Sequence, residues 1–306
     1  MDDAAGSDQD LPLVGRGAEL DDLDDAVASV SAGAGSIVLL EGEAGIGKSA
    51  LVDAMRTSAR LLGLEVRSAV ARPAGARRFG LLAEAMLAGD RGPNRRGHDE
   101  PWLLVLEDLH EADDESLAVL YRLAHEGTVP HALVLATIRP VPRPADLAAV
   151  VAAWTRAGAR YLELRPLSSD AALELAEAQL GASVGTSLRG SVLTAGGNPR
   201  FVTDVVRAVR EAGALQLTGH GVVDAVGSRW LDRLDAVVRC RIAYLGPDVV
   251  HARGGRLVFR HELVRSALYS GLDPSLRRAL HEDAARTLDA AGAPDVFVMS
   301  HRALAE

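Results

Sequence analysis

Residues 36–49 read SIVLLEGEAGIGKS, and this stretch decides the fold class of the chain. Its first part, 36–42, is a short apolar run that ends in glycine, which is typical of a strand buried on both faces of a sheet. The second part fits the pattern G-x-x-x-x-G-K-[ST] of a phosphate-binding loop, with motif residues Gly42, Gly47, Lys48 and Ser49. Such a loop directs backbone N–H groups at phosphate oxygens, and the helix that follows adds its positive end.

Within this loop, Lys48 is expected to reach the outer phosphates and the Ser49 hydroxyl to bind Mg²⁺. The alternative is a glycine turn with a coincidental lysine. The strand before the loop and a helix predicted after it, up to about Leu62, argue against that alternative. The expected nucleotide-binding residues of the loop are Gly42, Gly45, Gly47, Lys48, Ser49 and Ala50.

Strands and helices alternate over the first half of the chain, which predicts an α/β fold with a parallel sheet and crossover helices. An amphipathic helix is expected at 17–31. Further strands are expected at 64–71, 101–108, 131–139 and 159–167. After Ser168 the pattern changes to helices alone, at 169–180, 185–195 and 199–212. A polar, glycine-rich stretch, a hairpin strand and two more helices follow, at 216–227, 253–261, 261–270 and 274–291.

A phosphate-binding loop also needs a carboxylate on the metal side, at the end of a neighbouring strand. The run LLVLED ends in Glu107 and Asp108. Glu107 stands where an aspartate is usual, and we expect it to hold Mg²⁺ through water while Asp108 polarises the attacking water. The alternative is that the pair only caps the next segment. Arg139 ends another predicted strand and is a candidate sensor of the γ-phosphate, with an ordinary surface arginine as the alternative.

Composition narrows the function classes. The chain has 306 residues, 48% of them hydrophobic, which fits about two folded domains and excludes wholesale disorder. A net charge of −9 argues against a dedicated nucleic-acid binder, although a local basic patch stays possible. The single cysteine excludes an internal disulfide. The acidic N-terminus is unlike a secretory signal and no apolar run is long enough to span a bilayer, so we expect a cytoplasmic protein without membrane contact.

Other reactive residues give weaker signals. His110 follows the carboxylate pair, but packing is a simpler interpretation than metal binding. The segment HELVR at 261–265 lacks the second histidine of a zinc protease helix. Cys240 has no CxxC partner and is interpreted as an inert thiol. Three scattered residues are interpreted as packing side chains: Trp102, Trp154 and Trp230.

Six segments in a fixed order resemble the signal-transducing ATPases with numerous domains (the STAND class). They are LVGRGAEL at 13–20, the phosphate-binding loop, VLEDLHEADDESL at 105–117, ATIRP at 136–140, GGNPRFVTDVV at 196–206 and FRHELVRSALY at 259–269. Within the class, the chain is most similar to the ATPase module of large LuxR-type, MalT-like transcriptional regulators and their Orc1-like AAA relatives.

The resemblance implies further site residues. Val14, Gly15 and Arg16 match the segment that lines the adenine side. The segment Gly197–Pro199 matches a helical-lid element whose proline, Pro199, packs near the base. His261 matches a winged-helix histidine that reports on the diphosphate in related switches. The implied organisation is a tail at 1–11, a P-loop core at 12–167, a helical lid at 168–215 and a reduced winged-helix-like and helical region at 216–306.

The chain also departs from the resembled group. The stretch between Lys48 and Glu107 is short, as if a helical region around 88–100 were missing. The stretch between Cys240 and Phe259 is reduced, and Arg200 stands where an apolar residue is usual. The helical-repeat sensor and the helix-turn-helix of the group are absent, so direct DNA binding is not expected.

Three functions follow from these patterns. The favoured one is an ATP-dependent switch or slow ATPase, with ATP and Mg²⁺ between core and lid and a protein partner or self-association as the readout. The second is a degenerate nucleotide-binding or protein-interaction module without turnover. The third is a small-molecule phosphotransferase, which the acidic pair and the all-helical second half favour less.

Overall fold

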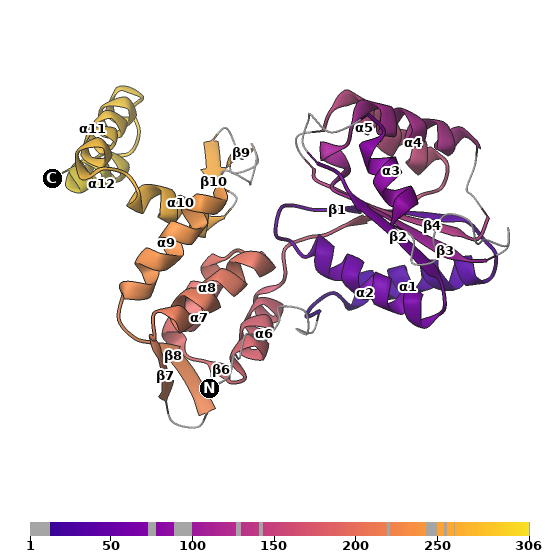
Figure 1. Cartoon of the computed structure of the whole chain (residues 1–306). Coiled ribbons are helices and arrows are strands. Elements are labelled where there is room, and N and C mark those ends of the chain that lie inside the picture. The colour runs from indigo at the N-terminus through magenta and orange to yellow at the C-terminus, as the bar shows by residue number, and fades with distance from the viewer. Residues whose placement is uncertain are drawn as a thin grey trace.

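The chain divides into a sheet-containing first half and a mainly helical second half (Figure 1). The computed structural model describes residues 13–72, 78–88, 100–126, 130–140, 143–218, 221–242, 250–253, 256–259 and 261–305. The predicted tail at 1–11 lies outside these ranges. The α/β class with a P-loop core and a helical region is confirmed.

Five parallel strands form the central sheet in the order β2-β3-β4-β1-β5. They are β1 (Ser36–Glu41), β2 (Glu65–Val70), β3 (Trp102–Glu107), β4 (Ala132–Ile138) and β5 (Arg160–Glu163). The first of these lies between β4 and β5, and β3 pairs with the far side of β4. The loops that follow β1, β3 and β4 therefore open at one edge of the sheet, where ligands of such sheets bind.

The last strand is shorter than the predicted 159–167. It ends after Glu163, and the Leu164 N–H donates to the Glu41 carbonyl at 2.7 Å as the chain leaves the sheet. Pro166 follows and has no N–H for a sheet ladder. The apolar pattern continues beyond the strand because Leu164 and Leu167 are buried in the cores on either side of this connection.

Helices cover both faces of the sheet (Figure 1). One face carries α1 (Gly17–Ser31) and α2 (Lys48–Leu61), and the other carries α3 (Gly80–Leu87), α4 (Asp114–Glu126) and α5 (Ala145–Arg156). In β1, Val38 and Leu40 pack toward the first face and Leu39 toward the second, which explains its continuous apolar run. Trp154 is buried under the second face and donates from Nε1 to the Leu120 carbonyl at 3.0 Å.

The predicted lid helices are present as α6 (Ser169–Leu180), α7 (Thr186–Thr194) and α8 (Pro199–Glu211). Side-chain caps fix two of their starts. The Ser168 hydroxyl accepts from the Ala171 N–H at 3.2 Å, and Asn198 Oδ1 accepts from the Arg200 N–H at 3.0 Å. Pro199 occupies the first turn of α8, where its missing N–H costs nothing.

The stretch 216–227, expected as a polar separator, forms a hairpin instead. Strands β7 (Leu215–Thr218) and β8 (Val222–Ala225) join the short β6 (Ser183–Val184) in a three-stranded sheet. Asp224 connects this sheet to the lid, since its carboxylate accepts from the N–H groups of Ser187 and Leu188 at the start of α7. The prediction missed the hairpin because its strands are short and only partly buried.

The lid and the segment after it share one hydrophobic core. This core joins α6, α7 and α8 to α9 (Arg229–Ile242) and α10 (Glu262–Ser270), with Trp230, Leu234 and Val264 among its buried members. Between α9 and α10 lies an antiparallel pair, β9 (Val250–Arg253) and β10 (Arg256–Phe259). The side chain of Cys240, in α9, is outside the described side chains.

The last two helices form a hairpin, α11 (Pro274–Ala290) and α12 (Asp295–Ala305). A chain of hydrogen bonds ties it to α10: the Tyr269 hydroxyl lies 2.7 Å from His281 Nε2, and His281 Nδ1 lies 2.8 Å from His301 Nδ1. None of the helices in the described ranges is long and apolar enough to cross a membrane.

Candidate functional site

The loop between β1 and α2 has the geometry of a phosphate cradle. Gly45 and Gly47 have φ values of +77° and +107°, which side chains with a Cβ rarely adopt. A Cβ at Gly45 would lie 2.6 Å from Arg200 Cβ, and one at Gly42 would lie 2.6 Å from Ile46 Cγ2. The helix begins at Lys48, so its first-turn N–H groups have no helical partners and face the loop.

Lys48 is folded back onto the loop. Its ammonium donates to the carbonyls of Gly42 at 2.7 Å and Glu43 at 2.9 Å. Burial lowers the pKa of Lys48 to about 8; the charge of Asp108 opposes this shift and that of Arg139 adds to it. An anionic ligand in the loop offers this buried cation a stronger partner than two neutral carbonyls.

A cavity of about 380 Å³ opens beside the loop. It is lined by most of the predicted site residues: Val14, Arg16, Gly45, Gly47, Lys48, Ser49, Ala50, Asp108, Arg139 and Pro199. Four predicted residues do not line it, namely Gly15, Gly42, Glu107 and His261. The volume and the mix of aliphatic and convergent polar groups are typical of a small-molecule site.

Asp108 and Arg139 reach the cavity from the ends of β3 and β4. Asp108 has a left-handed backbone (φ 55°, ψ 45°), which is uncommon for a residue with a side chain and clusters at functional sites. Its N–H donates to the Thr137 hydroxyl at 2.8 Å, which joins the two strand ends. Two charges of opposite sign, from the ends of neighbouring strands, therefore act on Lys48.

Glu107 has a different partner. Its Oε1 accepts from Arg56 Nη2 of α2 at 2.6 Å, and Arg56 Nη1 also donates to Asp53 at 2.8 Å. The side chains of Arg56 and Glu107 are only 19% and 12% exposed. The pair neutralises the carboxylate that the sequence assigned to Mg²⁺. Nothing in the loop motif or in LLVLED pointed to Arg56, which lies 51 residues before Glu107.

The segment before α1 closes one side of the site. Arg16 is buried, and its Nη2 donates to the Ile46 carbonyl of the loop at 2.9 Å. A Cβ at Gly15, where φ is +67°, would lie 2.8 Å from Ala171 Cβ of α6. The predicted Val14–Arg16 segment therefore touches both the phosphate loop and the lid.

The lid contacts the loop directly through the start of α8. Asn198 Nδ2 donates to the Ala44 carbonyl at 3.0 Å, and the Arg200 N–H donates to the Gly45 carbonyl at 3.2 Å. Arg200 makes this contact with its backbone, so its unusual side chain does not disturb it. Asn198 belonged to the resembled lid motif, whereas the Arg200 contact was not predicted.

The segment between β10 and α10 also reaches the loop. His261 Nε2 lies 2.9 Å from the Glu43 carboxylate, and this ring nitrogen is the donor because a carboxylate only accepts. The His261 ring is buried and packs edge-on against Phe201 of α8, with ring centres 5.2 Å apart. The sequence resemblance led to His261 but not to Glu43, a variable position of the loop motif.

His110 is buried at the side of the site, in the 3-10 turn η1 (Leu109–Glu111). Within the described part of the chain, neither ring nitrogen has a hydrogen-bond partner, and Asp108 Oδ1 is 3.9 Å away. Burial, reinforced by the charge of Arg139, lowers the pKa of His110 to about 4, so the ring is neutral near pH 7. Among the described residues, no three His, Cys, Asp or Glu side chains are grouped to hold a metal ion.

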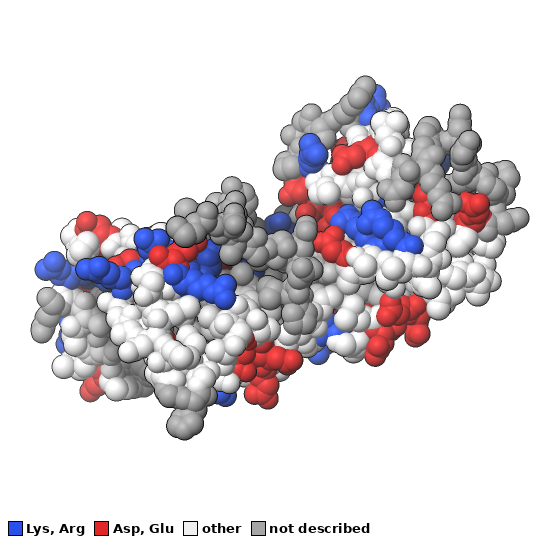
Figure 2. Space-filling model, turned by 60° about the horizontal axis from the view of Figure 1, so that its bottom comes forward, with Lys and Arg blue, Asp and Glu red and all other residues white. Residues whose placement is uncertain are grey.

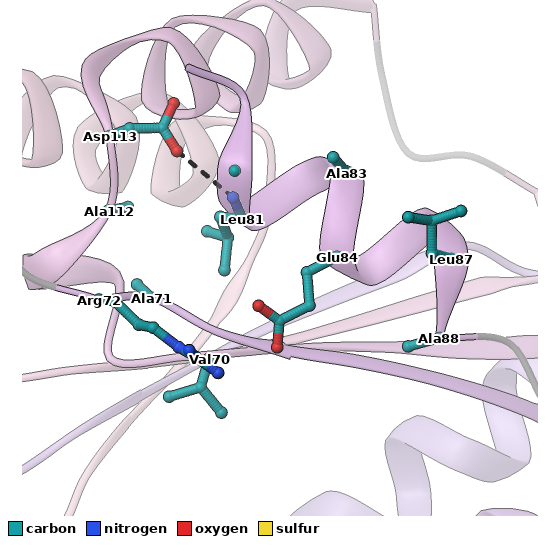
Figure 3. A pocket seen from close by; sticks show the side chains of 11 residues that line it. Val70, Ala71, Arg72, Leu81, Ala83, Glu84, Leu87, Ala88, Ala112 and Asp113 are labelled. Atoms are coloured by element: carbon teal, nitrogen blue, oxygen red, sulfur yellow. Dashed lines mark hydrogen bonds between the residues drawn. The ribbon is translucent and has the colours of Figure 1, made fainter. Parts of the chain in front are cut away.

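A second cavity, of about 590 Å³, lies between β2, α3 and the turn before α4 (Figure 3). Its lining is largely aliphatic, and Asp113 points to the N-terminal end of α3. That carboxylate is occupied structurally, because it accepts from the N–H groups of Phe79, Leu81 and Ser116. The cavity has no phosphate loop, so we assign the candidate site to the smaller one.

Comparison with known proteins agrees with this geometry. Residues 12–74 match the AAA ATPase domain family. This match covers the segment before α1, the phosphate loop, α2 and β2. It supports the predicted ATPase, while no curated protein is significantly similar to the chain in sequence.

Solved structures of similar fold include two Aeropyrum pernix proteins. The Orc2 protein has a TM-score of 0.52 at 14% identity, over 96% of this chain and 81% of that one. The Orc1 protein, solved in complex with DNA, has a TM-score of 0.52 at 16% identity, over 95% of this chain and 92% of that one. A mutant of Thermotoga maritima RuvB has a TM-score of 0.52 at 13% identity, over 85% of this chain and 96% of that one. At these identities the likeness establishes the fold alone.

Proposed function

We propose that the chain is an ATP-dependent switch module of the kind found in LuxR-type signal-transducing ATPases. The observation that carries this proposal is that three parts of the molecule meet on one phosphate loop. Asn198 of the lid contacts Ala44, His261 contacts Glu43, and Arg16 contacts Ile46. A ligand in the loop changes how strongly the loop binds each of these three parts. A ligand shifts the populations of two conformations only if it acts differently on them, and these contacts provide that difference.

The residues present fit ATP with Mg²⁺. The glycine cradle, Lys48 and the first turn of α2 suit the phosphates, and the Ser49 hydroxyl and the Asp108 carboxylate suit the metal side. When bound, Mg²⁺ neutralises charge on the phosphates. We assign to Asp108 the orientation of a water and to Arg139 a contact with the terminal phosphate, because both residues line the cavity. In this proposal Glu107 serves the metal side only after it leaves Arg56.

A nucleotide-holding module without turnover is the second candidate. The specific observation in its favour is the Arg56–Glu107 ion pair, which occupies the carboxylate expected at the metal. A protein partner or self-association remains the proposed readout in either case.

We do not extend DNA binding to this chain from its Orc1 neighbour. The net charge is −9, and arginines on the last helices pair with carboxylates, as in Arg265–Glu262, Arg286–Asp283 and Arg302–Asp289. On the face drawn in Figure 2, basic side chains at the C-terminal end are interspersed with acidic ones rather than forming a stripe.

The test is nucleotide binding combined with hydrogen exchange. Wild-type protein is expected to bind ATP with Mg²⁺ and to change exchange in 42–49, 196–206 and 261–269. Lys48→Ala should bind at least tenfold more weakly, since it loses a charged contact to phosphate. If wild-type protein hydrolyses ATP and Glu107→Gln does not, the switch is supported over the nucleotide-holding module without turnover. A folded protein that binds ATP without any change in exchange would sink the switch, and one that does not bind would sink both.

A further inference from the structure

The lining of the candidate cavity combines two chemically different sets of residues. One set is the phosphate loop with Lys48, Asp108 and Arg139. The other set has two polar residues of the predicted lid helices, Gln179 of α6 and Thr203 of α8, and the apolar residues Leu13, Val14, Leu167, Leu175 and Pro199. Aliphatic lining with few polar groups suits a nucleobase, and the polar groups among it fix which base is accepted.

Gln179 is held in one orientation by a short chain of hydrogen bonds. Thr203 Oγ1 donates its single proton to the Pro199 carbonyl at 3.0 Å, so this oxygen can only accept from the amide. Gln179 must therefore present Nε2 to Thr203, at 2.8 Å. The Gln179 backbone is also fixed, because its carbonyl accepts from Arg210.

The network leaves the Gln179 Oε1 atom as an acceptor. Among the described residues, none donates a hydrogen bond to it. Two charged side chains of the lining that come from outside the loop and the strand ends, Arg16 and Arg200, are only donors. Arg16 is bonded to Ile46 and Glu19, and Arg200 lies near Asp204. A base that binds here meets one side-chain amide whose free atom accepts.

We propose that Gln179 Oε1 accepts a hydrogen bond from the exocyclic amino group of adenine and so selects adenine nucleotides. This assignment rests on the proposed function, since it presupposes that the phosphates occupy the loop. Guanine and hypoxanthine carry a carbonyl at the same ring position, which would place two acceptors against each other. Sites that hydrogen-bond a substrate group discriminate against an analogue without it, because a buried polar group is left unpaired.

The first experiment compares three triphosphates on wild-type protein. ATP, inosine triphosphate and purine riboside triphosphate differ at ring position six, as amine, carbonyl and hydrogen, and the inosine base also carries a proton on N1. Calorimetry or fluorescence competition is expected to rank ATP tightest, by roughly tenfold over inosine triphosphate, with the unsubstituted purine between them.

Variants then assign the preference to the amide. Gln179→Leu should reduce the ratio of ATP to inosine triphosphate affinity to near one. Thr203→Val should also reduce this ratio of affinities, since the Gln179 amide is then free to rotate. If Thr203 only stabilised the fold, its replacement would leave the ratio unchanged. Gln216→Leu, an exposed amide on β7, is the matched control and should keep the wild-type ratio.

The outcomes separate this assignment from the proposed function. Tight binding of all three triphosphates with equal affinity overturns the assignment alone, as does a wild-type ratio kept in folded Gln179→Leu. Binding of none of them overturns the proposed function and the assignment with it.

Discussion

At the scale of single residues, the site is built around the buried ammonium of Lys48. With a pKa of about 8 in place of its ordinary 10.5, it is mostly charged at neutral pH and loses its proton in mildly basic solution. The neutral His110 does not titrate in that range, because its pKa is about 4. Lys48 is therefore the described site residue that makes phosphate binding sensitive to pH near 8.

We expect ATP affinity to fall as the pH rises from 7 to 9.5. Bound phosphate favours the charged amine and raises its pKa, so binding takes up a proton near pH 8. Calorimetric titrations with ATP in buffers of different ionisation enthalpy measure this proton uptake. Lys48→Arg stays charged throughout and should show a flat profile; a falling profile in that variant would contradict the assignment.

The lowered pKa of Lys48 also affects the stability of the folded chain. Between pH 8 and 10.5 the unfolded chain holds a proton on Lys48 that the folded chain has released. The contribution of this group to the free energy of unfolding therefore rises with pH across that window in nucleotide-free protein.

At the scale of elements, the Arg56–Glu107 pair joins α2 to β3 behind the loop. It therefore connects the helix that follows the phosphate loop to the strand that ends in Glu107. Removing one side chain of the pair leaves the charge of the other without its partner. The resulting loss of stability is larger than the net contribution of the intact pair.

Arg56→Ala is expected to lower the free energy of unfolding by roughly 3 kcal/mol. Adding Glu107→Gln should recover part of that loss, because no buried charge then remains. Urea denaturation of both single variants and the double variant measures the coupling. Arg60→Ala, one turn further on the same helix and exposed, is the control. Strictly additive losses would show that the two side chains do not interact.

The elements were largely predictable, and the contacts between them were not. Periodicity gave the strands and lid helices to within a few residues, because apolar patterns report burial. The motif spacings led to Lys48, Asp108 and Arg139 as candidates, since each ends or follows a buried strand, and all three line the cavity. Arg56, Glu43 and Gln179 carried no such signal: their roles come from tertiary neighbours 51, 218 and 24 residues away.

At the scale of the whole molecule, the His261 side chain, at the start of α10, connects the C-terminal region to the phosphate loop through Glu43. A hydrogen bond to a carboxylate contributes about 1.5–3 kcal/mol, enough to hold one arrangement over another.

His261→Ala is expected to raise hydrogen exchange in 42–49 roughly tenfold in nucleotide-free protein, because the loop loses this bond. Phe201 also loses its ring contact, so α8 should loosen to a smaller degree. His301→Ala changes a histidine in α12 and leaves the loop contact intact, which makes it the matched control. Equal exchange in both variants would contradict a role for His261 at the loop.

The shared core of α6–α10 has a mechanical consequence. Because these helices share one core, we expect them to move together, so that loss of the His261–Glu43 contact is accompanied by movement of α6, α7 and α8. The chain enters these helices from the sheet through Leu164–Leu167. The hairpin α11–α12 is attached through Tyr269 and His281 and lies away from the sheet (Figure 1). A rotation about Leu164–Leu167 would therefore displace this hairpin further than the phosphate loop.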